Sequence, residues 1–389
     1  MIITSILDTD LYKLTMQQAV LELFHDTHVT YKFTNRGKHR FNQEFLRDLN
    51  NEIGSMGNHI HLTDQEYKYM KSLRFIKPGY LEYLRNYRFK PEEVSASLTE
   101  DNDLDITISG PWHSTILWEV PLMALISELY FTIVDTNWNI ECKEYSNMTI
   151  DKAWDISHSF AEFGTRRRRT KVIQSLVCES IKYSDFCVGT SNIYFAMLNG
   201  MNPIGTAAHE WTMGISAIHG LRHANRYAME CWSKVYRGDL GIVLTDTYGT
   251  QDFFQKFDMY YAKLFDGVRH DSGCPFKFAT DVVNHYKKLN INPIGKTIIF
   301  SDGLDVETCQ KINEHCEDLG INWSFGIGTN MTNDKQYFGS ESLPLNMVIK
   351  LCTCDGVDVV KLSDDIGKAT GEENAKAIAL NMFFGRGHR

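Results

Sequence analysis

The sequence lacks the features by which several classes of protein are identified. Its net charge at pH 7 is −9, so it has no basic excess of the kind that an extended nucleic-acid contact needs. Asp8 and Asp10 interrupt the N-terminal apolar residues, and no apolar run approaches the length that spans a bilayer. These absences predict a protein that binds neither nucleic acid nor membrane.

Disulfide frameworks and zinc-binding cysteine pairs are also missing. The nine cysteines are an odd number, and their spacing in a chain of 389 residues resembles no disulfide framework. Neither Cys352 with Cys354 nor Cys309 with Cys316 has the spacing of a CxxC zinc pair. We therefore expect reduced thiols that serve in packing, in a cytoplasmic protein.

Two common nucleotide-binding motifs are absent as well. Residues 326–330 read Gly-Ile-Gly-Thr-Asn, but Met331 follows, so the dinucleotide motif G-x-G-x-x-G is not present. Residues 366–370, Ile-Gly-Lys-Ala-Thr, lack the upstream glycine of a P-loop. Residues 326–330 remain a candidate phosphate cradle, because glycines leave backbone N–H groups available to an anion.

What the sequence does contain is a series of short apolar runs from about residue 186 onward. Residues 242–244, 297–300 and 323–325 are apolar on both faces, which is typical of parallel strands covered by helices. Helical windows at 279–289 and 306–319 provide the crossovers. Because polar or glycine-rich residues follow each run, we predict an α/β fold with a β/α barrel whose site lies at the strand ends.

The first and last parts of the chain have a different pattern. We expect a helix at 11–24, a strand at 29–33, alternation over 94–108 and a buried helix at 120–134. Residues 346–351 and 357–362 predict a hairpin that returns to pack with the N-terminal strands.

A histidine set among small residues is the first candidate for chemistry. His209 follows Gly205, Thr206 and two alanines, which leave room for a ligand to approach. A lone histidine is more often structural, but Glu210 or the strand-end Asp246 could fix its tautomer and leave one ring nitrogen as base or nucleophile.

Charged residues follow several of the apolar runs. Any one of the set could simply cap the next helix, but together they suit a polyhydroxylated, multiply charged substrate with Mg²⁺. The members of this set are Asp246, Arg269, Asp271 and Asp302.

A basic run, Arg166 to Arg169, is the third candidate. A solvated helix face is the usual explanation of such a run. If a helix runs on through residues 174–176, these cations lie near its N-terminus, where its dipole disfavours them unless an anion binds too. We therefore predict an anion site with Arg166 and Arg167 as best candidates. Phe163 beside them offers a face for a flat ring.

Taken together, these motifs closely resemble those of the nicotinate phosphoribosyltransferase family of type II phosphoribosyltransferases. The resemblance runs from residues 8–16, Asp-Thr-Asp-Leu-Tyr-Lys-Leu-Thr-Met, to residues 361–364, Lys-Leu-Ser-Asp. Its most specific parts are residues 162–168, 208–211, 269–273 and 324–329. It implies an irregular α/β barrel at 121–344 beside an open-faced sandwich domain formed by 1–120 with 345–389.

The resemblance also implies an activity. Such enzymes transfer the phosphoribosyl group of 5-phosphoribosyl-1-diphosphate (PRPP) to nicotinate, giving nicotinate mononucleotide and diphosphate in NAD salvage. They use Mg²⁺ and couple the transfer to ATP hydrolysis through a phosphohistidine. The implied partners are the small molecules nicotinate, PRPP and ATP, with a homodimer needed if Tyr12 serves a neighbouring subunit's site.

Residue roles carried over from the family follow the matching motifs. His209 would be phosphorylated, Asp246 would position it, and Asp271 and Asp302 would contact ribose hydroxyls and magnesium. Phe163 and Tyr12 would stack on the pyridine ring, and Arg166 and Arg269 would hold its carboxylate and neighbouring anionic groups. The residues implied for the 5′-phosphate are Gly328, Thr329, Lys361 and Ser363.

One position discriminates between pyridine substrates. Related nicotinamide-using enzymes carry an aspartate where this chain has Ser191. An aspartate would repel the nicotinate carboxylate, by about 4 kcal/mol at contact distance and an effective dielectric near 20, whereas serine can donate to it. The chain departs from many relatives at Arg169, Thr170 and Cys274, so no family role is carried over there.

Alternatives from other classes remain open at the sequence level. A nicotinamide phosphoribosyltransferase is opposed by Ser191, and a non-catalytic sensor of phosphoribosyl ligands is opposed by the intact His209, Asp246, Arg269 and Asp302. A nucleic-acid-binding module would have to rely on the single basic run.

Overall fold

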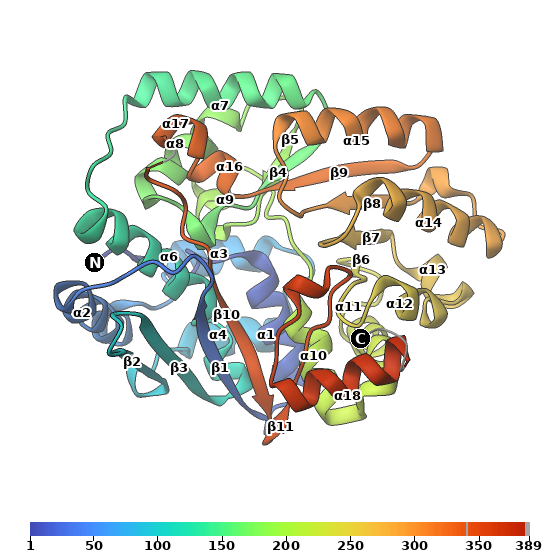
Figure 1. The fold of residues 1–389 in the computed structure, drawn as a ribbon, viewed down its shortest axis with the longest axis horizontal. Helices are drawn as coiled ribbons and strands as arrows, with labels where there is room; N and C mark the ends of the chain where they lie inside the picture. Colours follow the sequence, from blue (N-terminus) through green and yellow to red (C-terminus); the bar gives the residue numbers. More distant parts are fainter. Residues whose placement is uncertain (340, 386–389) are drawn as a thin grey trace. The chain divides into compact units, whose positions relative to one another are not determined.

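The computed structural model describes residues 1–339 and 341–385, which form two compact units (Figure 1). Unit 1 consists of Met1–Asp26, Thr30–Gly205 and Ile327–Lys350, and unit 2 of Thr27–Val29, Thr206–Gly326 and the chain from Leu351 on. The boundaries of these two units differ from those of the predicted domains, which are 1–120 with 345–389 and 121–344. The predicted domain assignment therefore stays a prediction.

An antiparallel sheet joins the N-terminal part of the chain to the C-terminal hairpin. Its strand order is β11-β10-β1-β3-β2. Because β10 lies beside β1, the predicted return of the hairpin to the N-terminal strands is confirmed. The strands are β1 (His28–Asn35), β2 (Val94–Leu98), β3 (Leu104–Pro111), β10 (Met347–Cys354) and β11 (Val357–Asp358).

The hairpin turn follows from its sequence. Cys354 pairs with Val357, and the two residues between them, Asp355 and Gly356, both have positive φ, at 49° and 76°. An Asp-Gly pair with left-handed backbone is the sequence that tight two-residue hairpins prefer. The second strand is shorter than the predicted 357–362, since only Val357 and Asp358 pair.

Helices make up most of unit 1, with a short parallel pair of strands, β4 (Phe160–Glu162) and β5 (Cys187–Thr190). The helices are α1 (Leu11–Leu23), α2 (Gln43–His59), α3 (Asp64–Ser72), α4 (Pro78–Asn86), α5 (Trp112–Thr115), α6 (Glu119–Leu129), α7 (Cys142–Ile156), α8 (Lys171–Ile181), α9 (Ile193–Asn199), α16 (Thr329–Thr332) and α17 (Lys335–Phe338).

The helical stretch Trp112–Val134, which includes α5 and α6, is long and apolar enough to cross a membrane by length and composition alone. This corrects the expectation that no run approaches that length. However, 78% of its most apolar window is buried inside the protein, as in a core helix. The predicted buried helix over 120–134 is confirmed in α6.

Unit 2 contains four neighbouring parallel strands: β6 (Ile242–Leu244), β7 (Gly267–His270), β8 (Thr297–Phe300) and β9 (Asn322–Ile327). Strands β6, β8 and β9 coincide with the three predicted apolar runs, which confirms the α/β class. Closure into a barrel stays a prediction. The helices are α10 (His209–His219), α11 (Ala224–Tyr236), α12 (Thr250–Lys256), α13 (Met259–Leu264), α14 (Pro275–Lys288), α15 (Val306–Leu319) and α18 (Glu373–Phe384).

Helices α14 and α15 are the predicted crossovers between parallel strands, a connection that needs about a dozen residues. Along α14 the buried side chains recur at helical spacing, from Phe278 and Ala279 through Val282 and Val283 to Tyr286. One apolar stripe thus faces the protein while the remaining side chains stay polar. Each strand is thereby followed by a loop at the same edge of the sheet.

A buried ion pair lies at the centre of unit 1. Arg168 donates from both terminal nitrogens to Asp8, at 2.7 and 3.0 Å, and also to Gln174 at 3.1 Å. Burial alone would raise the pKa of Asp8, but the charges of Arg168 and Lys171 and a hydrogen bond from Asn192 lower it to about 2. The carboxylate is therefore ionised throughout the physiological range.

Replacing this carboxylate by its amide should destabilise the protein strongly. In Asp8→Asn the fully buried Arg168 loses its nearest counter-charge and keeps only the more distant Glu128, at 3.8 Å; breaking a buried pair of this kind costs about 3–5 kcal/mol. We expect the free energy of unfolding, measured with urea, to decrease by about this amount relative to the wild type. Asp26→Asn, at an exposed carboxylate, is the control and should change stability by less than about 0.5 kcal/mol. Equal stability of the two variants would contradict the structural role of Asp8.

Candidate active site

The charged side chains predicted at the strand ends gather in unit 2. Asp246 follows β6, Asp271 follows β7 and Asp302 follows β8, while His209 is the first residue of α10. Figure 1 labels these four elements. Potential ligand atoms of His209, Asp246 and Asp271 all lie within 4.8 Å of one another. The structure therefore brings two of the predicted strand-end acids, Asp246 and Asp271, together with His209.

His209 is held by the carboxylate that the sequence analysis assigned to it. Its Nε2 lies 2.8 Å from Oδ1 of Asp246 and 3.7 Å from Oδ2 of Asp271. A carboxylate only accepts hydrogen bonds, so the short contact places the proton on Nε2. The lone pair of Nδ1 is then the nucleophilic position of the ring.

The environment keeps the imidazole neutral. Burial lowers the pKa of His209 to about 4, and the positive charge of Lys361 adds to this effect against the opposing charges of Asp246 and Asp271. A neutral imidazole is the form that can attack an electrophile. The histidine is therefore in its nucleophilic state at any pH above about 5.

Asp246 accepts hydrogen bonds from three side chains and forms an ion pair with a fourth. Besides His209, its carboxylate contacts Ser272 Oγ at 2.6 Å, Ser363 Oγ at 3.3 Å and Lys361 Nζ at 3.2 Å. Burial alone would raise its pKa, but His209, Lys361 and Ser272 together hold the pKa well below its usual value. The group is thus a fixed anion.

Asp271 is more accessible than Asp246. Ser301 donates to it at 2.9 Å, and the cations of Lys361 and Arg269 lie 3.8 and 4.0 Å away. Burial opposes ionisation, but Arg269, His209 and Lys361 lower the pKa of Asp271. Its side chain is still 27% exposed, so a ligand can reach it.

Asp302 forms an ion pair that the sequence analysis did not foresee. Nζ of Lys368 donates to both of its carboxylate oxygens, at 2.5 and 2.6 Å. In the sequence, Lys368 belongs only to the incomplete P-loop motif at residues 366–370. Its spacing from Asp302 in the chain gave no signal that the two side chains meet.

The predicted magnesium ligands have suitable chemistry. Asp271 and Asp302 are carboxylates, the donors that Mg²⁺ prefers, and their side chains are 27% and 28% exposed. Asp302 does not belong to the close group of His209, Asp246 and Asp271. The residues therefore fit a metal bound mainly through a substrate, in which the protein supplies one or two carboxylates.

The residues predicted to bind the pyridine ring lie in unit 1. Phe163 and Arg166 follow β4 and are partly exposed, as a binding residue must be. Nη1 of Arg166 is 4.0 Å from Oε1 of Glu119, whose other oxygen lies 2.5 Å from Nζ of the buried Lys13. Arg166 thus lies among the buried charges of Glu119 and Lys13, and its charge also acts on Asp10.

Ser191 is placed differently from what its predicted role needs. It is fully buried, and its hydroxyl donates to Oδ1 of Asp10 at 2.7 Å. A serine has one hydroxyl proton, so while this bond is made Ser191 cannot also donate to a ligand. Burial raises the pKa of Asp10 against the opposing effects of Arg166 and Ser191. Position 191 is thus tied to the carboxyl of Asp10.

The basic run lies directly before a helix that runs through residues 174–176, as the sequence predicts. Residues Thr165–Arg167 form a 3-10 turn, and α8 begins at Lys171 after its N-cap Thr170. Arg167 donates to the carbonyl of Met347 at 2.7 and 3.1 Å. The predicted anion role of Arg167 is therefore in competition with a backbone contact.

The last two arginines of the run, Arg168 and Arg169, are buried, and their guanidinium groups contact other residues of the protein. Arg168 pairs with Asp8, as described above. The guanidinium of Arg169 lies 3.8 Å from the ring centres of both Phe131 and Phe338 and donates to Ser342 at 2.7 Å. The alternative of a solvated basic face is wrong for both residues, because neither is exposed.

Tyr12 and the glycine-rich segment complete the predicted set in unit 1. Tyr12 lies in the first turn of α1 and is 4% exposed. Gly205 has a φ of 147°, and a side chain added to it would meet the Tyr12 backbone nitrogen at 3.2 Å. Gly328 and Thr329 are partly exposed at the start of α16, and a Cβ on Gly328 would approach the Phe163 carbonyl at 3.1 Å.

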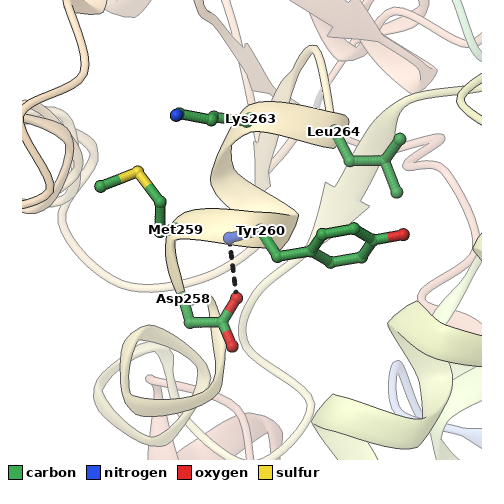
Figure 2. A pocket seen from close by; sticks show the side chains of 5 residues that line it. All are labelled: Asp258, Met259, Tyr260, Lys263 and Leu264. Atoms are coloured by element: carbon green, nitrogen blue, oxygen red, sulfur yellow. Dashed lines mark hydrogen bonds between the residues drawn. The ribbon is translucent and has the colours of Figure 1, made fainter.

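A surface hollow on α13 lies apart from these residues. Figure 2 shows its lining side chains, with Asp258 accepting a hydrogen bond from the backbone nitrogen of Tyr260 at 3.0 Å. Its lining consists of Asp258, Met259, Tyr260, Lys263 and Leu264. None of these belongs to the predicted site, and the hollow plays no part in the chemistry described above.

Two protein-family models match the chain. A model of the nicotinate phosphoribosyltransferase (NAPRTase) family matches residues 158–388, and a model of the N-terminal domain of the same family matches residues 7–127. The two matches cover the strand-end cluster of unit 2 and the N-terminal segment with Tyr12.

Individual relatives agree with the family models. The chain is 49% identical to a nicotinate phosphoribosyltransferase of Methanosarcina acetivorans and 50% identical to one of Methanococcoides burtonii; each comparison covers 99% of this chain and 98% of the relative. The crystal structure of the nicotinate phosphoribosyltransferase of Porphyromonas gingivalis superimposes with a TM-score of 0.93 at 38% identity, over 98% of this chain and 100% of that one.

The lowered pKa of His209 predicts a specific pH dependence of stability. An unfolded histidine takes up its proton near pH 6.5, whereas folded His209 does so only at about pH 4. The unfolded state therefore binds more protons in this window, and stability falls as the pH is lowered through it. Compared with His209→Gln, the wild type should lose up to about 3 kcal/mol between pH 7 and pH 4. Urea unfolding at several pH values measures this difference. If the free energies of unfolding of the wild type and His209→Gln changed in parallel with pH, the prediction would be contradicted.

Proposed function

The chain belongs to the nicotinate phosphoribosyltransferase family, and on this premise we propose that it transfers phosphoribosyl from PRPP to nicotinate, coupled to ATP hydrolysis. The products are nicotinate mononucleotide and diphosphate, in NAD salvage. The observation that carries the proposal is His209, neutral and hydrogen-bonded to Asp246, within a chain that is similar to such enzymes over 99% of its length.

In the transfer step, the lone pair of the pyridine nitrogen forms a bond to C1 of the ribose. The bond from C1 to the diphosphate oxygen breaks, and its electron pair leaves with diphosphate. Positive charge develops on the sugar as this bond opens, and a fixed carboxylate such as Asp271 stabilises it. No proton has to move at the reacting nitrogen, so positioning and electrostatics supply most of the catalysis.

The coupling to ATP proceeds through His209. Nδ1 attacks the γ-phosphorus of ATP, the bond to the ADP oxygen breaks, and ADP leaves with that electron pair. Asp246 holds the proton on Nε2 and stabilises the positive charge that the ring acquires. Water later hydrolyses the phosphohistidine and releases inorganic phosphate.

Phosphorylation changes the charge of the site substantially. It adds about −1.5 to −2 charges beside Lys361 and Arg269. Such a change drives the cycle only if the phosphorylated and free enzymes bind PRPP or product with different affinity. Lys361, 3.2 Å from Asp246, is placed to respond to it.

Magnesium would be held by Asp271 and Asp302 together with the substrate, and it supplies positive charge to the diphosphate leaving group. In unit 1, Phe163 and Tyr12 stack on the pyridine ring and Arg166 binds its carboxylate, with Arg269 in unit 2 serving neighbouring anionic groups.

The 5′-phosphate is assigned to a further set of residues: Gly328, Thr329, Lys361 and Ser363. We also propose a homodimer, in which Tyr12 serves the neighbouring subunit's site. Analytical ultracentrifugation tests this proposal, because a monomeric active enzyme would rule it out.

The assay that tests the function measures product from nicotinate and PRPP with Mg²⁺, with and without ATP, and with nicotinamide as competitor. We expect nicotinate mononucleotide and ADP, and no product from nicotinamide. His209→Ala should abolish the coupling of ATP hydrolysis to product, because the phosphoryl acceptor is gone. His219→Ala, at the exposed end of the same helix, is the control. Binding of PRPP without turnover in the wild type would favour a sensor instead.

Substrate preference should depend on the charge at position 191. In Ser191→Asp a carboxylate stands beside Asp10 and near the predicted binding place of nicotinate. Repulsion of up to about 4 kcal/mol should lower kcat/KM for nicotinate at least tenfold. Ser191→Asn has the same size without the charge and should retain more activity. If the two variants lose nicotinate activity equally, the charge at position 191 does not set the preference.

A further inference from the structure

The proposed mechanism leaves Lys368 unused, although it lies in the same loop of unit 2, residues 361–370, as Lys361 and Ser363. The ends of this loop are joined by two backbone hydrogen bonds of 2.9 Å, in which Lys361 and Thr370 each donate to the other. Lys361 and Ser363 at its start contact Asp246, and Lys368 near its end contacts Asp302. One short closed loop therefore supplies side chains to two of the strand-end acids.

The backbone of the loop fixes the position of Lys368. Asp365 accepts from the backbone nitrogen of Gly367 at 3.0 Å through its side chain, and from that of Lys368 at 2.8 Å through its carbonyl. Asp364 anchors the other side of the loop, because it accepts from the backbone nitrogen of Thr250 at 2.8 Å. Lys368 thus projects from an anchored turn.

Lys368 is also the most accessible cation of this site. Its side chain is 35% exposed, compared with 17% for Arg269 and 8% for Lys361. Its partner Asp302 is 28% exposed. An anionic ligand that arrives from solvent therefore meets Lys368 before the other two cations.

The ion pair between Lys368 and Asp302 is easy to exchange. A partly exposed pair of this kind contributes little to stability, since both charges are also well solvated when apart. A ligand with several phosphate oxygens offers an ammonium group stronger, charge-assisted hydrogen bonds than one carboxylate does. The same exchange leaves Asp302 without its lysine, and hence available to a cation.

We propose that Lys368 binds the diphosphate group of the phosphoribosyl donor, and that it holds Asp302 in the ligand-free protein until that group arrives. The proposal rests on the proposed function, since it names a further binding residue for that reaction. It also gives a role to the Gly367–Lys368 pair, which no nucleotide-binding motif had explained.

The test is Lys368→Gln, which keeps most of the side-chain length and removes the charge. Because one charge-assisted contact to phosphate is lost, KM for PRPP should rise about 10- to 100-fold. The KM values for nicotinate and ATP should change by less than twofold, and Lys368→Arg should recover part of the PRPP affinity. The matched control is Lys376→Gln, a lysine of α18 that pairs with Glu373 away from the strand ends.

A second measurement does not depend on turnover. Mn²⁺ binding to the protein without substrates, followed by electron paramagnetic resonance, reports whether Asp302 is available. Lys368→Gln should bind Mn²⁺ at least threefold more tightly than the wild type, because Asp302 no longer has a competing ammonium group. Lys376→Gln should bind it as the wild type does.

The outcomes separate the two proposals. If the wild type makes no nicotinate mononucleotide, the proposed function fails, and direct PRPP titration by calorimetry still tests Lys368. If the wild type is active but the PRPP affinity of Lys368→Gln is within twofold of it, the inference is wrong. A rise in KM for ATP alone, or unchanged Mn²⁺ binding, would overturn it equally.

Discussion

The buried carboxylate of Asp246 needs polar partners, and its four partner side chains come from three separate parts of unit 2. His209 comes from α10, Ser272 from the loop after β7, and Lys361 with Ser363 from the loop at 361–370. A carboxylate buried without such partners would be protonated or would destabilise the fold. The same contacts fix the tautomer of His209 and keep Lys361 beside it. The position and tautomer of His209 therefore follow from the need of the buried Asp246 carboxylate for hydrogen-bond donors and a cation.

Two uses of charge are combined in this chain, and local sequence does not distinguish them. Arg166, Arg168 and Arg169 belong to one basic run, yet Arg168 pairs with a buried acid and Arg169 lies between two aromatic rings. Only the partly exposed Arg166 fits the predicted substrate contact. What separates them is the identity of distant partners, such as Asp8, which is 160 residues from Arg168 along the chain. An isolated run of arginines gives no information about partners so far away.

The parts of the fold that could be predicted are those with local physical causes. Apolar runs identified β6, β8 and β9, helical spacing identified α14 and α15, and the Asp355–Gly356 pair identified the hairpin. Polar residues after each strand identified Asp246 and Asp271, because parallel strands bring their carboxyl ends to one edge. The pairing of Lys368 with Asp302, and of Ser191 with Asp10, could not be predicted. These contacts join residues 66 and 181 positions apart, and no periodicity connects them.

The loop at 361–370 is tied to the histidine side of the site through Lys361 and to Asp302 through Lys368, and its two ends are bonded to each other. In a loop held in this way, the free energy of the contacts at one end depends on the contacts at the other end. Under the proposed mechanism, the new charge on phosphorylated His209 alters the free energy of Lys361, and the closed loop connects this change to the proposed ligand contact of Lys368. By reciprocity, a ligand bound at Lys368 would then change the phosphorylation equilibrium of His209 by the same factor. In that mechanism, a closed loop of ten residues links an energy source to substrate binding without movement of the strands.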